Sequence, residues 1–311
     1  MKKQKIICVV GPTASGKTEL GIRLAGAFGG EVISADSMQI YRDMHIASAA
    51  PDSSETEGVP HHLVEFLPYG STFTVADYVK AAREKIAEIS SRGKMPIIVG
   101  GTGLYINSLV NNVEFIQNDT DIVLRESITK EFELVGGAEM LKRLREIDPE
   151  TADKLHENDK RRIIRAFEIY ESTGKTKSFN DEMSIKNESP YSACMIGVTY
   201  RDRELLYDRI NCRVDIMLEN GLLDEAKAAY QKNLGGGAVQ AIGHKEFFDC
   251  FKGEISFECA TENLKRSTRR YAKRQLTWFN KDTRIKWIYK DETDDAAAAA
   301  INYAKEEVNY A

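Results

Sequence analysis

Short β-branched runs alternate with longer amphipathic stretches through the first hundred residues. This pattern predicts three strands and two helices, at Lys5–Val10, Glu31–Ala35, Pro96–Val99, Lys17–Phe28 and Val75–Ser90 respectively. Strands that alternate with helices are typical of a parallel sheet with crossover helices. We expect ligands to bind at the carboxyl ends of these strands, where such sheets form their sites.

The β-branched runs then stop, and the chain becomes polar and helical in pattern. Three helices are predicted, at Asp119–Glu133, Ala138–Glu146 and Asp159–Glu171, the last with Asn158 or Asp159 as its N-cap. We therefore expect two domains. One is a core formed by 1–112 and 191–311. The other is an all-helical insertion domain at 113–190, which we expect to contact a macromolecular partner.

After the insertion the pattern returns to the sheet and then becomes mainly helical. The predicted strands are Ala193–Thr199 and Ile285–Tyr289, and the predicted helices are Asp202–Glu219, Leu222–Gln231, Lys245–Phe251, Phe257–Trp278 and Asp294–Val308. A flexible joint is predicted between two of these helices, at the three consecutive glycines Gly235, Gly236 and Gly237.

The turn between the first strand and the first helix matches the pattern G-x-x-x-x-G-K-(S/T) at every fixed position. Its residues are Gly11, Pro12, Thr13, Ala14, Ser15, Gly16, Lys17 and Thr18. Glycines let backbone N–H groups turn toward an anion, and the helix that follows directs its positive end there. We predict that this P-loop binds a diphosphate or triphosphate, with Lys17 as a counter-charge and the Thr18 hydroxyl on a Mg²⁺ ion. A glycine-rich turn without a ligand is the structural alternative.

The motif and its flanking elements define the predicted fold class. It is α/β, a P-loop NTPase-like parallel sheet flanked by helices, with the helical insertion added to it. Alone, the motif is typical of an ATP-binding kinase or NTPase.

Polar residues follow the second predicted strand. Asp36 stands where this strand ends, so its carboxylate is expected at the phosphate site, either near Mg²⁺ or as a base that accepts a proton from a nucleophile. Capping a turn is its structural alternative. Ser37, Met38 and Gln39 come next, and a glutamine amide can hydrogen-bond adenine through two atoms. This segment is therefore predicted to hold a flat polar group such as a base.

A second glycine-rich turn, Gly100–Gly103, follows the third predicted strand. Its glycines permit close backbone approach, and the Thr102 hydroxyl could donate to an oxygen that gains negative charge on a leaving group. A purely structural strand-to-helix turn is the alternative. Its place beside a P-loop favours a functional role.

The net charge of −5 hides a strongly basic segment. No acidic residue occurs between Asn263 and Lys281, and the predicted helix there carries two rows of cations at i, i+4 spacing: Lys265, Arg269 and Lys273, and Arg266, Arg270 and Arg274. Lys160, Arg161, Arg162 and Arg165 form a second basic cluster. A solvated helix face is the ordinary explanation of such cations, but a nucleic-acid phosphate backbone would also neutralise them.

Other features exclude several classes of protein. The five cysteines are widely spaced and include no C-x-x-C pair, which is typical of reduced thiols in a cytoplasmic protein. The first apolar run is too short for a signal peptide, and no stretch suits a membrane span. Adjacent His61 and His62 lack carboxylate partners at ligand spacing, so we expect local hydrogen bonds from them instead of a metal site.

Together these motifs resemble the bacterial tRNA dimethylallyltransferases, also called tRNA isopentenyltransferases. The resemblance covers most of the chain and rests on an ordered series of segments: 11–18, 33–42, 58–63, 100–105, 158–166, 240–243 and 268–279. It implies transfer of a dimethylallyl group from dimethylallyl diphosphate to the exocyclic amine of the adenosine immediately 3′ of the anticodon, with Mg²⁺ and release of pyrophosphate. It also implies that the P-loop holds the diphosphate of this donor and not ATP.

The resemblance assigns roles to individual residues. It implies that Asp36 is the general base and that Thr102 and Arg213 assist the leaving group. It further implies that the anticodon stem-loop of tRNA contacts three segments, made up of Asp36, Ser37, Met38 and Gln39; Lys160, Arg161, Arg162, Ile163 and Ile164; and Gln240, Ala241, Ile242, Gly243, His244 and Lys245. We expect a cytoplasmic monomer.

One loop departs from the family pattern. Asp43 and Ala47 replace expected glycines, and Ala50 replaces an expected lysine, so we assign this loop no contact. Two rival functions remain. An adenylate isopentenyltransferase acting on free AMP, ADP or ATP would not need the insertion or the basic helix, and a P-loop kinase of a small molecule would consume ATP. A non-catalytic nucleotide switch would leave Asp36 without a role.

Overall fold

The computed structural model describes residues 3–115, 121–184, 188–232, 238 and 241–310, without the side chains of 309 and 310. The predicted Gly235–Gly237 joint lies outside these residues. The structure divides the chain into two units, one formed by Met1–Val110 and Ser189–Ala311 and the other by Asn111–Glu188. We call them the core unit and the inserted unit. No helix in the described part of the chain is both long and apolar enough to cross a membrane.

Six strands of the described residues form one parallel sheet in the core unit, as the α/β prediction requires. Their order is β3-β2-β4-β1-β5-β6, with bounds β1 Gln4–Val10, β2 Glu31–Ser34, β3 His61–His62, β4 Pro96–Gly100, β5 Tyr191–Thr199 and β6 Lys286–Tyr289. β1 is central because its residues pair with β4 on one side and with β5 on the other. The strand β3 was not predicted.

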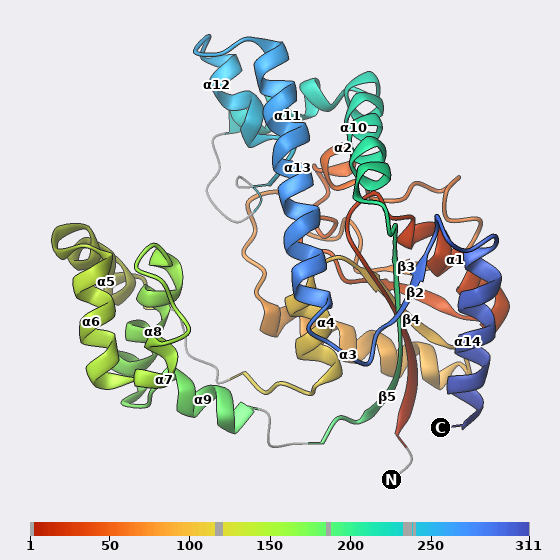
Figure 1. The fold of residues 1–311 in the computed structure, drawn as a ribbon, viewed down its shortest axis with the longest axis horizontal. Coiled ribbons are helices and arrows are strands. Elements are labelled where there is room, and N and C mark those ends of the chain that lie inside the picture. The colour runs from red at the N-terminus through yellow and green to blue at the C-terminus, as the bar shows by residue number, and fades with distance from the viewer. Residues whose placement is uncertain (1–2, 116–120, 185–187, 233–237, 239–240, 311) are drawn as a thin grey trace. The chain divides into compact units, whose positions relative to one another are not determined.

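Helices cover both faces of this sheet and continue beyond its carboxyl edge (Figure 1). Their bounds are α1 Lys17–Phe28, α2 His45–Ser48, α3 Val75–Ser91, α4 Gly103–Val110, α10 Arg203–Glu219, α11 Leu222–Lys232, α12 Phe248–Phe251, α13 Phe257–Phe279 and α14 Ala296–Tyr310. The continuous helix predicted at Lys245–Phe251 is instead a 3₁₀ turn, η2 Lys245–Phe247, followed by the single turn α12.

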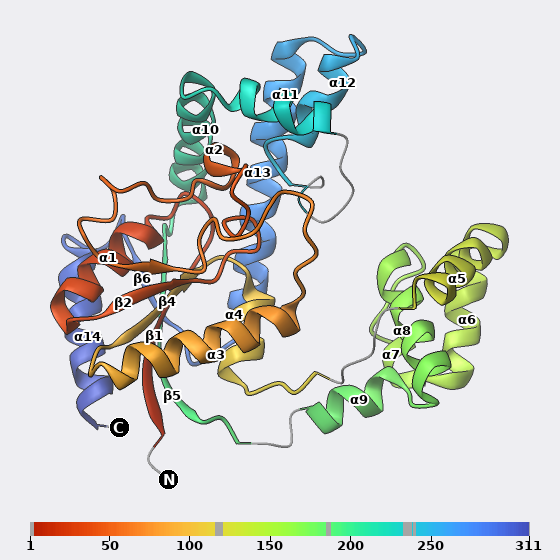
Figure 2. The same ribbon diagram turned by 180° about the vertical axis from the view of Figure 1, so that it is seen from behind.

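The sheet is apolar on both faces because helices bury both. α1 and α14 pack against one face, where Leu24 and Ala304 meet β-strand residues such as Val9 and Ile196. Figure 2 shows α3 and α4 on the opposite side, and their contact is fixed by stacked Tyr78 and Tyr105 rings whose centroids lie 4.1 Å apart. Burial on two faces explains why the strands read as continuous apolar runs.

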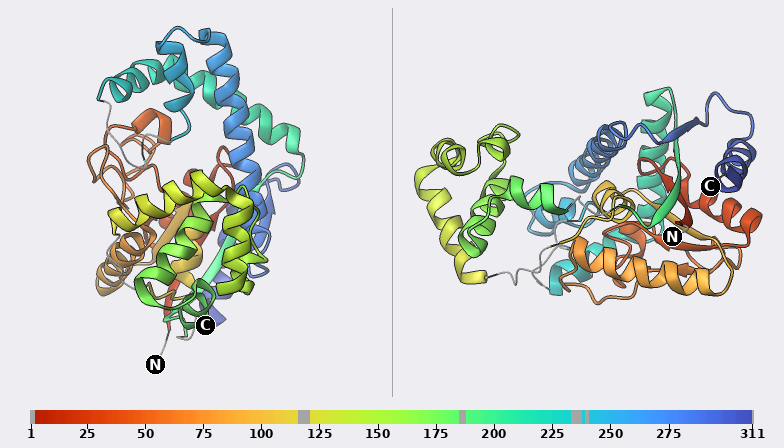
Figure 3. Two further views of the ribbon diagram at one scale, coloured as in Figure 1. Left: turned by 90° about the vertical axis from the view of Figure 1, so that its left-hand side faces the viewer. Right: turned by 90° about the horizontal axis from the view of Figure 1, so that it is seen from below.

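The inserted unit is helical throughout its described residues (Figure 3). Its helices are α5 Ile122–Val135, α6 Gly137–Ile147, α7 Pro149–Ala152, α8 Lys160–Thr173 and α9 Lys177–Ser184. They enclose a separate hydrophobic core that includes Ile128, Met140, Leu144, Ile163 and Phe167. This core draws on no residue of the core unit, so the inserted unit buries its own apolar surface.

Candidate active site

A cavity of about 290 Å³ lies in the core unit at the carboxyl ends of the strands. The structure brings most of the predicted chemistry together around it. Its lining includes Thr13, Lys17 and Thr18 of the P-loop, Asp36–Gln39 after β2, Gly100 at the end of β4, Arg213 of α10, Ala241–Gly243 and Lys245, and Tyr271, Arg274 and Gln275 of α13. The prediction that ligands gather at this edge of the sheet is thus matched by a cavity there.

The P-loop has the backbone that an anion cradle needs. Gly16 caps the N-terminus of α1 with a φ of 89°, in the left-handed region that favours glycine. Lys17 lies at the start of the helix and its Nζ donates a hydrogen bond to the Pro12 carbonyl at 2.6 Å. The pKa of Lys17 is lowered to about 7, mainly by burial and also by the nearby charge of Arg213, while the charge of Asp36 acts in the opposite direction. The ammonium therefore lacks a sufficient counter-anion, which a diphosphate would supply.

Asp36 lies two residues beyond the end of β2, held by a tight local turn. Its Oδ1 accepts a hydrogen bond from the Met38 backbone N–H at 2.9 Å. Its charge raises the pKa of both Lys17 and Arg213, although burial, the larger effect, lowers the pKa of each. The carboxylate therefore shares its electrostatic environment with the two cations that the sequence assigned to a diphosphate.

The residues present fit a Mg²⁺ ion only with help from a substrate. The Thr18 hydroxyl and the Asp36 carboxylate line the same cavity and are the hard oxygen donors that Mg²⁺ prefers. Among the described residues, no group of three His, Cys, Asp or Glu side chains could hold a metal by itself. Phosphate oxygens would complete the coordination, as is usual for Mg²⁺ at phosphate sites.

Thr102 is fixed against the segment that follows β2. Its Oγ1 accepts a hydrogen bond from the Ser37 backbone N–H at 3.0 Å and lies 3.4 Å from the Ser37 Oγ. Tyr271 also hydrogen-bonds to Thr102, and its pKa is raised because it is buried and lies near Asp36. The hydroxyl therefore has a defined position beside the cavity.

The side-chain amide of Gln39 forms hydrogen bonds within the protein, and none of its atoms is free for the predicted contact with adenine. Its Oε1 accepts a hydrogen bond from Ser34 Oγ at 2.8 Å, and its Nε2 donates to the Ala49 carbonyl at 3.0 Å. Both amide atoms are thus engaged within the protein. The predicted two-atom contact with a base would require these bonds to break, so the amide acts here as a loop support.

Sequence reasoning assigned no role to Gln275, which joins the two glycine-rich turns. Its Oε1 accepts a hydrogen bond from the Thr13 backbone N–H at 2.8 Å, and its Nε2 donates to the Gly101 carbonyl at 3.0 Å. The residue is only 5% exposed. One signal could have identified it: it is a polar residue on the buried stripe of α13, between Ala272 and Phe279.

The segment 241–245 lies partly at the cavity and partly in the interior. Ala241, Ile242, Gly243 and Lys245 line the cavity, and Gln240 lies outside the described residues. The side chain of His244 is not available for the predicted tRNA contact. Its side chain is fully buried, and its Nε2 lies 2.8 Å from Glu225 Oε1 of α11.

Glu225 also holds the loop that departs from the family pattern. Its carboxylate accepts hydrogen bonds from the Ile46 and Ala47 backbone N–H groups at 2.8 and 2.9 Å. Burial raises its pKa, but the hydrogen bonds from His244 and these N–H groups outweigh burial, and the pKa is lowered. Ala47 lines the cavity, so a loop that the sequence left without a contact forms part of the site wall.

The predicted tRNA-binding segment of the inserted unit is only partly at the surface. Arg161 and Arg162 are exposed, and Lys160 forms a 2.8 Å ion pair with Glu133. The side chains of Ile163 and Ile164 are not available for the predicted tRNA contact, because they are 0% and 5% exposed and belong to the core of this unit. Their side chains position the helix, and only the cations are available to a phosphate backbone.

The basic stripe on α13 is narrower than its sequence predicts. Lys265 forms a 2.7 Å ion pair with Asp215 of α10, and Arg269 donates a 2.6 Å hydrogen bond to Asn211 of the same helix. These partners come from another segment, so the absence of acids within α13 did not reveal them. The second row, Arg266, Arg270 and Arg274, is exposed.

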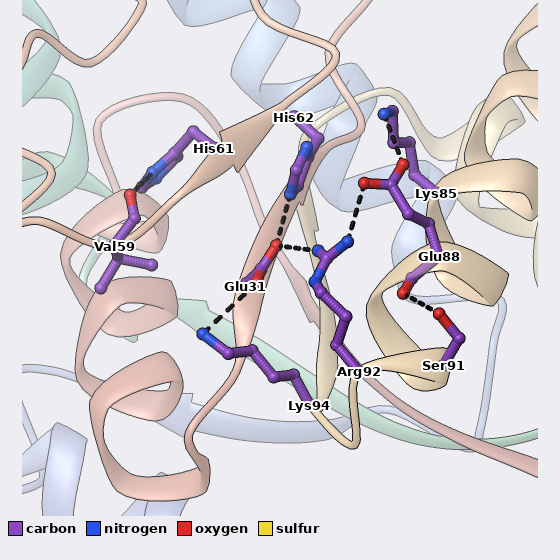
Figure 4. Close-up of polar contacts among 9 residues, drawn as sticks. All are labelled: Glu31, Val59, His61, His62, Lys85, Glu88, Ser91, Arg92 and Lys94. Carbon is purple, nitrogen blue, oxygen red and sulfur yellow. Dashed lines mark hydrogen bonds and ion pairs between the residues drawn. The ribbon is translucent and has the colours of Figure 1, made fainter.

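Both histidines form hydrogen bonds within the protein, as predicted (Figure 4). His62 Nε2 lies 2.7 Å from Glu31 Oε2, and His61 Nδ1 lies 2.9 Å from the Val59 carbonyl. Arg92 and Lys94 complete the charges around Glu31, at 2.7 and 3.5 Å. Burial raises the pKa of Glu31, but hydrogen bonds from His62 and Arg92 outweigh it, so the pKa is lowered. The cluster lies at the start of β2, away from the carboxyl end that carries Asp36.

Comparison with known proteins is consistent with this geometry. A family model described as IPP transferase matches residues 39–282. The tRNA dimethylallyltransferase of Caldanaerobacter subterraneus is 47% identical over 293 residues, covering 93% of this chain and 92% of the relative. That of Bacillus velezensis is 47% identical over 308 residues, covering 99% and 96%.

Solved structures agree with these sequence relatives. The full-length tRNA isopentenylpyrophosphate transferase of Bacillus halodurans matches with a TM-score of 0.72 at 39% identity and covers 99% of both chains. A eukaryotic dimethylallyltransferase acting on tRNA matches with a TM-score of 0.80 at 32% identity, covering 95% of this chain and 77% of that one.

A P-loop that shares one cavity with a carboxylate and an arginine, on a parallel sheet flanked by helices, fits a transferase built on the P-loop fold. The extent of the matches then identifies the family. The chain belongs to the IPP transferases.

Proposed function

We propose that this enzyme transfers the dimethylallyl group of dimethylallyl diphosphate to tRNA. The acceptor is the exocyclic amine of the adenosine immediately 3′ of the anticodon, and pyrophosphate is released. The proposal depends on one observation: Asp36 shares a cavity with the P-loop cation Lys17 and with Arg213. In this proposal Asp36 is the base, and Lys17 and Arg213 bind the diphosphate leaving group.

The reaction balances with the groups in this cavity. The amine nitrogen forms a bond to the allylic carbon as the carbon–oxygen bond to the diphosphate breaks, and the electron pair of that bond leaves with pyrophosphate. Asp36 accepts the proton that the amine loses. Lys17, Arg213 and the Thr102 hydroxyl stabilise the negative charge that grows on the pyrophosphate, which is where a transition state of this kind gains most from fixed donors.

The P-loop would hold the diphosphate of the prenyl donor, although its motif is typical of ATP-binding proteins. When bound, Mg²⁺ would neutralise part of the diphosphate charge, and the hydroxyl of Thr18, which lines the cavity, would help to hold it. The exposed cations Arg161 and Arg162 of α8 and Arg266, Arg270 and Arg274 of α13 supply charge for the anticodon stem-loop. We expect the enzyme to act as a monomer in the cytoplasm, where tRNA is found.

Acceptor competition tests this proposal against its rivals. The protein is incubated with Mg²⁺, labelled dimethylallyl diphosphate and either unmodified tRNA or AMP, and ATP consumption is followed in parallel. Label on tRNA is the expected result. Label on AMP alone would identify an adenylate isopentenyltransferase, and ATP consumption without prenyl transfer would identify a kinase.

An Asp36→Ala variant tests the assigned base. Transfer should fall about 10²- to 10⁴-fold, the usual contribution of a positioned general base, while tRNA binding measured by filter retention stays unchanged. A variant that transfers at the normal rate would remove Asp36 from the mechanism without affecting the choice of acceptor.

A further inference from the structure

A second cavity, of about 410 Å³, lies in the core unit, and its lining shares no residue with that of the candidate active site. Its floor is apolar and includes Ile106 and Phe279, whereas Asn107, Trp278 and Lys281 lie exposed at its rim. Trp278 is 41% exposed, so part of its ring is open to a ligand. Neither the base nor the diphosphate site proposed above uses these residues.

Trp278 lies directly against the catalytic turn. The ideal position of a Cβ on Gly103 would be only 2.2 Å from Trp278 Cδ1, so the indole packs on the backbone of this glycine. Gly103 immediately follows Thr102 and begins α4. Figure 1 shows the carboxyl end of α13 beside α4, which is the contact that brings the indole there. One wall of the second cavity is therefore a direct neighbour of the turn that carries Thr102.

A row of cations leads along α13 to this indole. Arg266, Arg270, Arg274 and Trp278 repeat at i, i+4 spacing, so they share one face of the helix, and all four are exposed. Arg274 lines the catalytic cavity and Trp278 lines the second one. Within the described part of the chain, no carboxylate forms an ion pair with Arg270 or Arg274.

The rim of the second cavity is positively charged, like the exposed face of α13. Arg284 is neutralised by two hydrogen bonds to Asp282, at 2.8 and 2.6 Å, whereas no described carboxylate pairs with Lys281. An exposed aromatic face with free cations beside it is the pattern by which proteins hold single-stranded nucleic acid: the base stacks on the ring and the phosphate meets the cation.

We propose that this cavity is a second nucleotide subsite, in which the base of an RNA nucleotide flanking the target adenosine stacks on Trp278. The inference rests on the proposed function and names a further contact of the same substrate. Turning the target adenine out of the loop leaves a neighbouring base without its stacking partner. Trp278 replaces that partner, while Arg274 and Lys281 receive the flanking phosphates.

Fluorescence provides a direct test, because the chain has only two tryptophans. In a Trp287→Phe background, Trp278 is the sole indole, and an unmodified anticodon stem-loop RNA should quench its emission in a saturable titration. Replacing the flanking bases one at a time by abasic sites should abolish the quenching at one position. Quenching that survives every abasic substitution would overturn the stacking contact.

Kinetics separate this contact from a structural role. Trp278→Ala should raise the KM for the RNA about 5- to 150-fold, the range expected for loss of one stacked base, and Trp278→Phe should recover most of it. The KM for dimethylallyl diphosphate should not change. Phe257→Ala is the matched control, since Phe257 is an equally exposed aromatic (40%) at the other end of α13.

Other outcomes assign the failure to a definite cause. If RNA is modified normally but Trp278→Ala leaves its KM unchanged, the subsite is absent and the proposed function stands. If Trp278→Ala instead lowers kcat and leaves both KM values unchanged, and Trp278→Phe does not restore kcat, the indole only supports the Thr102 turn. If the wild-type protein neither binds nor modifies RNA, the proposed function itself fails.

Discussion

The two glycine-rich turns of the core unit look alike in sequence but differ in what their second glycines do, although the first glycine of each, Gly11 and Gly100, has no room for a Cβ. In the P-loop, Gly16 is needed for its backbone conformation, and the φ of 89° keeps the turn open around a site for an anion. In the turn 100–103, glycine is needed for space. A Cβ on Gly100 would lie 2.2 Å from the Ala35 carbonyl oxygen, and one on Gly101 would lie 2.1 Å from Gln275 Nε2.

The difference separates a binding element from a positioning element. The P-loop presents Lys17, whose lowered pKa reflects the need for a counter-anion. The second turn is filled by the protein itself: Gly100 lines the cavity, and the Thr102 hydroxyl is held against Ser37, which also lines it. We expect the first turn to govern donor affinity and the second to govern the rate of the chemical step.

Removing the hydroxyl from the second turn should have the largest effect on rate. Thr102→Val is expected to lower kcat about 10²- to 10³-fold, as loss of one transition-state donor does, and to leave pyrophosphate affinity unchanged. Thr102→Ser should retain most of the activity. Single-turnover transfer and pyrophosphate calorimetry measure the two quantities. A loss of affinity in place of rate would mean that the two turns share one task.

Adding a methyl group to the filled turn should cost stability. Gly100→Ala is expected to lower the free energy of unfolding by about 1–3 kcal/mol, because the new Cβ meets backbone atoms that must move. Gly26→Ala is the matched control. Gly26 lies within α1 with no neighbour within 4 Å of the added Cβ, so alanine there should be neutral or stabilising.

Urea titration followed by tryptophan fluorescence checks this prediction. Both tryptophans belong to the core unit, so the signal reports its unfolding. Equal stability of Gly100→Ala and Gly26→Ala would contradict the steric explanation of the second turn.

Uncoupling the two turns should have a smaller effect. In Gln275→Glu the carboxylate still accepts from Thr13 but faces the Gly101 carbonyl without a proton to donate, and loss of such a buried bond costs about 1–3 kcal/mol. We expect weaker pyrophosphate binding together with a lower kcat, since both turns lose their common support. Thr277→Ala, at an exposed position of the same helix, serves as the control. A change confined to one parameter would mean that the turns are positioned independently.

The smallest expected effect is an uptake of protons when diphosphate binds. With a pKa of about 7, Lys17 is partly neutral at pH 7 in the empty site, and a bound diphosphate should favour its charged form. Binding should therefore take up a fraction of a proton, and affinity should fall as the pH rises above 7. Calorimetry of pyrophosphate binding in buffers of different ionisation enthalpy measures this uptake. Lys17→Met should show only the uptake due to pyrophosphate itself, and equal uptake in both proteins would exclude the lysine as its source.

Local signals predicted much of the fold. The helix Lys17–Phe28 was predicted to the residue because the left-handed glycines Gly16 and Gly29 limit it on both sides. The strand His61–His62 was missed, since two residues have no periodicity and this strand depends on pairing with the edge of β2. The same limit applies to the 3₁₀ turn at Lys245–Phe247.

The sequence predicts those site residues that lie at the ends of strands. Asp36 and Thr102 were predicted as site residues because each follows a strand of the sheet. Gln275 was missed because nothing in the sequence brings it near Thr13 or Gly101. His244 was assigned to tRNA with the rest of its segment, because its partner Glu225, from another helix, could not be foreseen.

The place of the inserted unit has a consequence for synthesis of the chain. β1 pairs with β5 along all seven of its residues, from Gln4 with Tyr191 to Val10 with Gly197. The ribosome must therefore complete the inserted unit before the central strand can gain its second neighbour. Until then one edge of an apolar strand stays unpaired, the condition in which nascent chains aggregate. The inserted unit, whose core is contiguous in sequence, can fold during that interval and keep its own apolar residues out of reach.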